Sequence, residues 1–156
     1  MGIHYVNWIS TASGVEDFNI HADSLAWVVG DSDAVQIEQT KSYHGSPIYM
    51  IRAEIKNKSK ARKSLARLGS PTLQRILDEI DSRIDDNNVI HIRLDMKKLL
   101  SGNIEISAPD CGFTIKGRAK LEVYPGSSAK DVAIGTLEEL IDLANKNNLP
   151  EKLTLE

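Results

Sequence analysis

The fold is decided by residues 43–67, which read YHGSPIYMIRAEIKNKSKARKSLAR. The stretch begins with a tight turn ending at Pro47, which lacks a backbone N–H and therefore suits the first position of a strand rather than its interior. The apolar residues of the strand that follows share one face: Tyr49, Ile51, Ala53 and Ile55. Arg52 and Glu54 fall on the other face, so this segment predicts a half-buried strand.

The period changes after Ile55, and the next twelve residues predict a basic amphipathic helix. At helical pitch Ala61, Leu65 and Leu68 line up on one side, and cations lie nearly opposite. The candidate phosphate ligands of this segment are Lys56, Lys58, Lys60, Arg62, Lys63 and Arg67. The structural alternative is a solvated helix face that keeps the protein in solution or pairs with acidic residues of the following helix.

Composition restricts where a nucleic-acid role can come from. The 156 residues carry a formal net charge of −3, with 41% hydrophobic and 26% charged residues, which is typical of one soluble globular domain, residues 1–156. Any RNA-binding surface must therefore come from local charge asymmetry. From Arg52 to Arg67 there are seven basic residues and one acidic, whereas from Leu68 to Asp86 there are five acidic and two basic.

Compartment and membrane association follow from cysteine content and hydropathy. A single cysteine, Cys111, excludes an internal disulfide and is typical of a reducing cytoplasm. Neither a signal-peptide pattern nor an apolar run long enough for a bilayer is found. We therefore expect a cytoplasmic protein without a membrane partner, and a poorly ordered tail over residues 150–156.

The rest of the chain extends the same α+β pattern. Further strands are predicted at residues 4–11, 34–41, 89–95, 102–106 and 113–123, and further helices at 17–29, 70–84 and 128–147. Asp17, Ser70 and Ser128 are predicted N-caps, and Gly30 and Gly69 are predicted C-terminal stops. Most strands alternate apolar and polar residues, which favours an antiparallel sheet with helices on one side, in the order β-α-β-β-α-α-β-β-β-α.

A second candidate RNA surface lies on the polar side of the sheet. Lys116, Arg118 and Lys120 project from one face of the strand at 113–123. If Arg52 and Arg93 lie on neighbouring strands, these five cations form one basic surface. The alternative is charge compensation by Glu54, Glu105 and Glu122 within the protein.

Catalytic and metal-binding patterns are weak. The four histidines lack metal-ligand spacing, His44 suits a turn better than general-base chemistry, and neither a Gly-rich phosphate loop nor a nucleophile motif is found. We therefore expect no catalytic residue, cofactor or metal. The acidic residues that suggest a Mg²⁺ site are the pairs Asp78-Glu79 and Asp85-Asp86, which we call the acidic grouping.

Three segments together resemble a known family. They are Ile9-Ser10-Thr11, the turn Tyr43-His44-Gly45-Ser46-Pro47-Ile48, and the block Ile92-Arg93-Leu94-Asp95 followed by Lys97-Lys98 and Gly102. In order and spacing they are similar to the small archaeal RNA-binding proteins described as exosome-subunit-like, over residues 3–124. The resemblance implies a fold like that of ribosomal protein L5 and RNA binding.

The leading hypothesis is a non-catalytic protein that contacts the backbone of duplex or structured RNA, as an accessory in RNA processing or translation. Few aromatic residues are available for base stacking, and no aromatic RNA-recognition motif is present. One alternative is a module for homodimerisation or for assembly into a larger complex, through an open sheet face carrying Trp8, Ile48 and Met50. Another is a metal-dependent nuclease that uses the acidic grouping.

Overall fold

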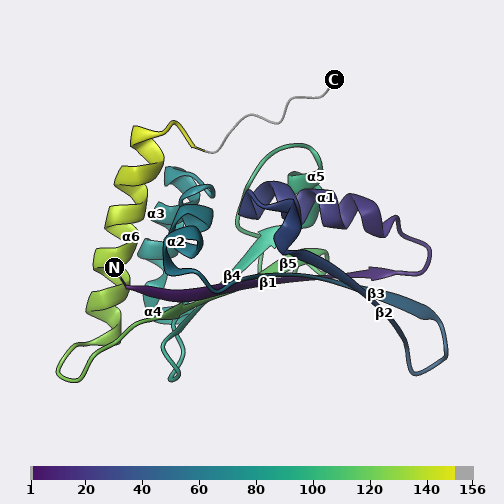
Figure 1. The fold of residues 1–156 in the computed structure, drawn as a ribbon, viewed down its shortest axis with the longest axis horizontal. Coiled ribbons are helices and arrows are strands. Elements are labelled where there is room, and N and C mark those ends of the chain that lie inside the picture. The colour runs from purple at the N-terminus through teal and green to yellow at the C-terminus, as the bar shows by residue number, and fades with distance from the viewer. Residues whose placement is uncertain (1, 150–156) are drawn as a thin grey trace.

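Five strands form one antiparallel sheet in the computed structural model, which describes residues 2–149 (Figure 1). Their bounds are β1 Ile3–Ser13, β2 Val35–Lys41, β3 Pro47–Ile55, β4 Val89–Asp95 and β5 Thr114–Leu121. The order across the sheet is β2-β3-β1-β5-β4, and all neighbouring pairs run antiparallel. The predicted α+β class with an antiparallel sheet is therefore confirmed.

Helices cover only one face of this sheet. Figure 1 shows the sheet nearly edge-on, with the helices above it and the lower face uncovered. The helices are α1 Phe18–Val29, α2 Lys58–Ala66, α3 Ser70–Asp78, α4 Ile80–Arg83, α5 Met96–Leu100 and α6 Ala129–Lys146, with a 3₁₀ turn at Ser32–Ala34.

Alternation along the strands separates a buried face from an open one. In the central strand β1, Val6, Trp8 and Ala12 are buried, while Asn7 and Ile9 lie on the opposite face. The same alternation buries Ile51, Ala53 and Ile55 of β3 and Ile115, Ala119 and Leu121 of β5. The apolar core therefore lies between the sheet and the helices, and the open face keeps the polar residues.

Local signals set most helix ends as predicted. The Asp17 side chain accepts a hydrogen bond from the backbone N–H of Asn19 at 2.9 Å, and the Ser128 hydroxyl accepts one from the N–H of Asp131 at 3.4 Å. Gly30 ends α1 in the left-handed conformation, with φ 74°. These residues therefore set the first residues of α1 and α6 and the last residue of α1.

The region predicted as a strand at 102–106 is not a strand, so the sheet has five strands and not six. Ile106 makes one isolated bridge to Leu94 at the edge of β4. The backbone N–H of Asn103 is used in the turn that closes α5, and Pro109 follows three residues after Ile106. Too few residues remain between these two constraints to form a ladder.

Two further predictions need correction. The single helix expected at 70–84 is divided at Glu79, where φ and ψ are −106° and 19°, and Gly69 precedes α3 as the N-cap in place of Ser70. Ile37 lies opposite the buried Ile51 on the covered face but is 44% exposed, because β2 is an edge strand.

Some expectations stay predictions. The topology of ribosomal protein L5 is not established by the strand order alone, and the predicted tail at 150–156 lies outside the described residues. Within residues 2–149, every helix is too short or too polar to cross a bilayer.

Candidate nucleic-acid interface

Three cations share one row across the open face of the sheet. In the strand register, Ile9 of β1 lies between Arg52 of β3 and Lys116 of β5, and Lys116 lies opposite Arg93 of β4. Because neighbouring strands are about 4.8 Å apart, the row spans about 14 Å from Arg52 to Arg93. All three side chains are exposed.

The adjacent row adds a fourth cation and a histidine. It runs from Glu54 of β3 through Asn7 of β1 and Arg118 of β5 to His91 of β4. The positive groups therefore concentrate on β5 and β4, where Lys116, Arg118 and Arg93 are close neighbours. We call Arg52, Arg93, Lys116 and Arg118 the open-face cations.

The open-face cations keep their charge available to a ligand. Within residues 2–149, none of the four forms an ion pair with a carboxylate. Arg52 makes one contact within the same face, a hydrogen bond to Met50 Sδ at 3.7 Å. Unpaired cations gathered on one face produce a local positive field that attracts phosphates.

Lys120 and His91 are engaged locally. The Lys120 ammonium donates to the backbone carbonyl of Asn87, which directs it toward the loop before β4. His91 Nε2 lies 2.7 Å from Asp85 Oδ2, and this hydrogen bond lowers the pKa of Asp85 from its usual value. Lys120 and His91 therefore border the open-face cations but are less available to an incoming phosphate.

A hollow of about 440 Å³ lies at the centre of the open face. Its lining includes Asn7, Ile9, Gln36, Arg52, Glu54, Lys116 and Arg118. Asn7 Oδ1 is buried and has no hydrogen-bond partner within residues 2–149. Such an unpaired oxygen costs about 1–3 kcal/mol, so the hollow contains an acceptor that favours a donor from a ligand.

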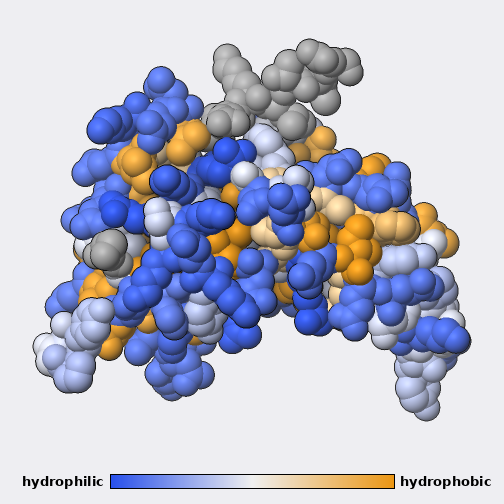
Figure 2. Space-filling model, viewed as in Figure 1, coloured by the Kyte–Doolittle hydropathy of each residue, from blue (hydrophilic) through white to orange (hydrophobic). Residues whose placement is uncertain are grey.

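The open face is arched. The β2–β3 hairpin and the loop before α6 project beyond the sheet on its uncovered side (Figure 1). Figure 2 shows a concave, mainly hydrophilic margin between the β2–β3 hairpin and the loop before β4, which also projects on this side. A concave basic surface suits the convex backbone of structured RNA.

The cations of the basic helix are largely engaged by the protein. Lys58 Nζ lies 2.8 Å from Glu122 Oε2, Arg62 Nη2 lies 3.3 Å from Glu139 Oε2, and Lys56 Nζ lies 3.8 Å from Glu54 Oε1. The hydrogen bond to Glu122 raises the pKa of Lys58, and the same bond lowers the pKa of Glu122. These pairs reduce the positive field of this segment.

Arg67 is also engaged in the fold. Its guanidinium donates two hydrogen bonds to the carbonyl of Trp27, at 3.2 Å from Nε and 2.8 Å from Nη2. This carbonyl is near the C-terminus of α1, where orphan carbonyls favour a cation.

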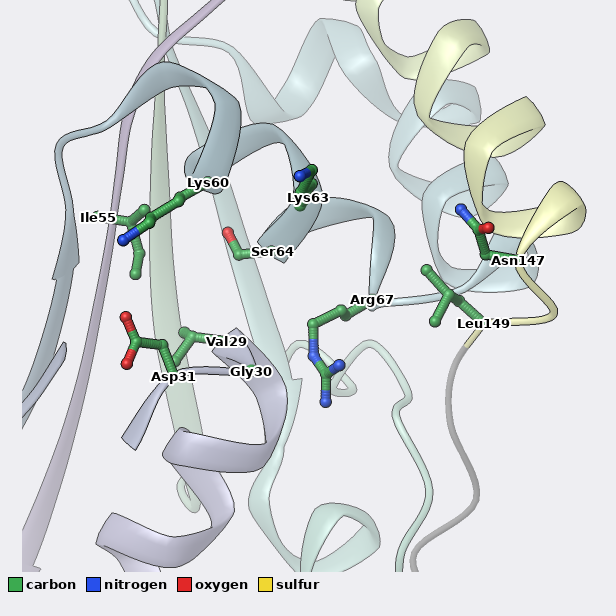
Figure 3. A pocket seen from close by; sticks show the side chains of 10 residues that line it. All are labelled: Val29, Gly30, Asp31, Ile55, Lys60, Lys63, Ser64, Arg67, Asn147 and Leu149. Carbon is green, nitrogen blue, oxygen red and sulfur yellow. The ribbon is translucent and has the colours of Figure 1, made fainter. Parts of the chain in front are cut away.

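Lys60 and Lys63 remain on α2 without an ion pair within residues 2–149, and they line a hollow of about 680 Å³. Figure 3 shows Lys60 facing Asp31 across this hollow, with Arg67 extending past Gly30. The hollow lies among α1, α2 and the end of α6, on the side of the sheet that the helices cover. The predicted α2 residues and the predicted sheet residues therefore do not form one surface.

The acidic grouping is tied to the protein's own donors. Glu79 Oε1 lies 3.1 Å from Arg75 Nε, Glu79 Oε2 lies 3.0 Å from Arg83 Nε, and Asp85 also accepts from the backbone N–H groups of Asn87 and Val89. Within the described part of the chain, no three His, Cys, Asp or Glu side chains are grouped as a metal site would require.

One polar cluster was not predicted. Ser10 Oγ lies 2.7 Å from His21 Nδ1, and His21 Nε2 lies 2.8 Å from Glu16 Oε2. Burial alone would raise the pKa of Glu16, but hydrogen bonds from His21 and Ser13 bring it below its usual value. The connectivity is like that of a hydrolase triad, yet Ser10 is 2% exposed and His21 3%, so the cluster links β1 to α1 inside the fold.

The proposed self-association surface is not formed as predicted. Trp8 is 2% exposed and lies on the covered face, whereas Ile48 and Met50 lie on the open face. The reason is the period of two along β1: Trp8 has the same parity as Val6 and Ala12, which face the helices.

Comparison with known proteins identifies a family and a curated relative. A family model described as RNA binding matches residues 13–121. The RNA-binding protein PAB1135 of Pyrococcus abyssi is 23% identical over 111 residues, which are 69% of this chain and 70% of that protein.

Solved archaeal structures share the fold. Mth689, a DUF54 protein from Methanothermobacter thermautotrophicus, has a TM-score of 0.72 at 25% identity, covering 90% of this chain and 99% of that one. The DUF54 protein AF2318 from Archaeglobus fulgidus has a TM-score of 0.69 at 24% identity, covering 88% of this chain and 99% of that one.

Proposed function

Because the chain belongs to the family described as RNA binding, we propose that it binds RNA through the open face of its sheet. The observation that carries this proposal is the row Arg52, Ile9, Lys116 and Arg93, whose three cations lie on one uncovered face without ion pairs to carboxylates within residues 2–149. Four open-face cations can each contact one phosphate as charge-assisted hydrogen-bond donors.

The RNA proposed is structured or duplex, and it is read mainly through its backbone. The concave margin in Figure 2 supports this choice, as does the position of the aromatic residues. Tyr49 stacks on Phe18 at a centroid distance of 4.3 Å, and Trp8 is buried, so neither offers a free ring for base stacking. The exposed rings of Tyr43, Phe113 and Tyr124 lie in loops outside the strands of the open face. Shape and phosphate contacts therefore dominate.

The proposed role is that of a non-catalytic accessory in RNA processing or translation, in the cytoplasm. The family description and the PAB1135 name support the RNA-binding part of this proposal. In this proposal the α2 cations contribute little to RNA affinity, because Lys58 and Arg62 already pair with Glu122 and Glu139. Desolvating such a paired lysine for a phosphate would first require its own ion pair to break.

A charge-reversal experiment separates the two surfaces. The double variant Lys116→Glu/Arg118→Glu changes the open face, and Lys60→Glu/Lys63→Glu makes the same change in net charge on α2, behind the sheet. We expect the first to weaken binding of a hairpin RNA about 100-fold at 0.1 M salt, and the second less than about threefold. The measurement is fluorescence anisotropy with a labelled hairpin.

Both variants need a check of folding by far-ultraviolet circular dichroism. The opposite ranking of the two double variants would move the site to α2. Equal, unreduced affinity in both would contradict RNA binding through either surface.

A further inference from the structure

We propose that the hollow at the centre of the open face holds the base of one unpaired nucleotide, with guanine preferred over the other bases. The proposal rests on the proposed function, because the open-face cations would hold the phosphates on either side of that nucleotide. Beyond the proposed function, this inference specifies that the RNA has an unpaired nucleotide and that the protein prefers guanine at that position.

The strand register builds a slot of suitable width. Ile9 lies between Arg52 on β3 and Lys116 on β5, so the two cations flank an apolar floor with their backbones about 10 Å apart. A planar base can enter between these long side chains, where the Arg52 guanidinium can stack on its face. The volume of about 440 Å³ is within the range of small-molecule sites.

The adjacent row of the sheet, which contains Glu54 and Asn7, supplies the hydrogen-bond acceptors that would distinguish one base from another. Glu54 and Asn7 lie opposite each other in the register, and both line the hollow. A carboxylate only accepts hydrogen bonds, and Asn7 Oδ1 is a buried acceptor without a partner within residues 2–149. Glu54 Oε1 is 3.8 Å from the exposed Lys56, a contact that leaves its other oxygen free of any hydrogen bond to the described residues.

Two neighbouring acceptors match guanine. Its Watson–Crick edge places the N1–H and N2–H donors side by side, so it can donate to two adjacent acceptors, here the free oxygen of Glu54 and Asn7 Oδ1. Adenine, cytosine and uracil each offer one donor position on that edge. In a duplex this edge is used by the pairing partner. The base must therefore be unpaired to be read in this way.

The test uses one RNA stem with a single bulged nucleotide, prepared with guanine, adenine, cytosine or uracil at the bulge, and the same stem fully paired. The proteins are the wild type, Glu54→Gln, and the matched control Glu38→Gln. Glu38 lies on the same face, opposite Met50, outside the hollow. Affinities are measured by fluorescence anisotropy, and folding of each variant by thermal denaturation.

We expect the wild type and Glu38→Gln to bind the guanine bulge at least about tenfold more tightly than the adenine bulge. Glu54→Gln should lose this preference while it binds the paired stem as well as the wild type or better, because it removes a negative charge beside the phosphates.

Equal affinity of the wild type for all bulges and for the paired stem would overturn the base site and leave backbone binding intact. A guanine preference that survives in Glu54→Gln would overturn the assignment of the selecting group. Binding to none of these RNAs would overturn the proposed function as well.

Discussion

Gly117 lies between two open-face cations, Lys116 and Arg118, in the sequence of β5. On the covered face of the strand, its Cα faces the Trp8 ring. A Cβ at this position would lie 2.5 Å from the Trp8 ring. The buried indole therefore requires a glycine in the middle of β5, and the position of the cations on the open face depends on a core contact beneath them.

This contact predicts that Gly117→Ala lowers the free energy of unfolding by about 1–3 kcal/mol, because Trp8 or β5 must shift. Urea denaturation gives the measurement. A matched alanine substitution, Gly135→Ala in α6, has nothing within 4 Å of the new Cβ and should leave stability unchanged or raise it by up to about 1 kcal/mol. A Gly117→Ala variant as stable as the wild type would show that Trp8 is not held against β5.

Arg67, the C-cap of α2, is the cation of the basic segment with the clearest structural role, because it donates two hydrogen bonds to the Trp27 carbonyl. We predict that Arg67→Ala lowers the free energy of unfolding by about 1.5–3 kcal/mol, because the bonds are charge-assisted and part-buried. Lys63→Ala, a substitution in the same hollow, should change it by less than about 0.5 kcal/mol. Equal effects of the two variants in a thermal or urea denaturation would contradict this role.

At the scale of the element, the junction of α3 and α4 depends on one carboxylate. Glu79 accepts hydrogen bonds from Arg83 and Arg75, which hold its pKa below the usual value. A carboxylate whose pKa is lower in the folded state stabilises the protein above its unfolded-state pKa. That stabilisation is lost as the pH falls through the folded-state pKa.

We therefore predict that the wild type loses stability below about pH 4.5 and that Glu79→Gln removes part of this loss. The contribution should stay below about 1 kcal/mol, because Glu79 is 36% exposed and screened by solvent. Urea denaturation at pH 7 and pH 3.5 measures the difference, with Glu138→Gln on α6 as the control. A Glu79→Gln variant whose pH dependence matches that of both the wild type and the control would refute the prediction.

At the scale of the whole molecule, a chain with net charge −3 carries the four open-face cations without carboxylate partners among residues 2–149. The acidic residues are distributed so that many of them pair with cations away from that face, as Glu122 and Glu139 do with α2. If RNA binds at the open face as proposed, its attraction to the protein is directional.

This arrangement predicts the salt dependence of binding. If the four open-face cations each neutralise one phosphate, the slope of log K against log salt should be about −3 to −4. Lys116→Glu/Arg118→Glu should reduce the slope by about 2, and Lys60→Glu/Lys63→Glu should leave it unchanged. A slope near zero in the wild type would exclude phosphate contacts as the source of affinity.

The sequence by itself determined the local structure. Alternation along β3 and β5, the N-cap at Asp17 and the stop at Gly30 depend on interactions within a few residues, so they could be read from the chain. The five sheet residues and the six residues of the basic segment were both predicted as candidates. The missing strand at 102–106 escaped prediction because the Asn103 N–H is used to close α5 and Ile106 makes only one bridge to Leu94. The division of the helix at Glu79 escaped prediction because neither a glycine nor a proline marks it in the sequence.

Only the tertiary structure decided which cations remain available. Lys58 meets Glu122, 64 residues away in the sequence, because the first residue of α2 lies beside the end of β5. A pattern within a few residues cannot predict a contact over that sequence separation. The row of Arg52, Lys116 and Arg93 likewise depends on the register of four strands with Ile9 between two of them. The sign of a charge is a property of the residue. Whether that charge is paired within the protein or available to a ligand depends on the packing that surrounds it.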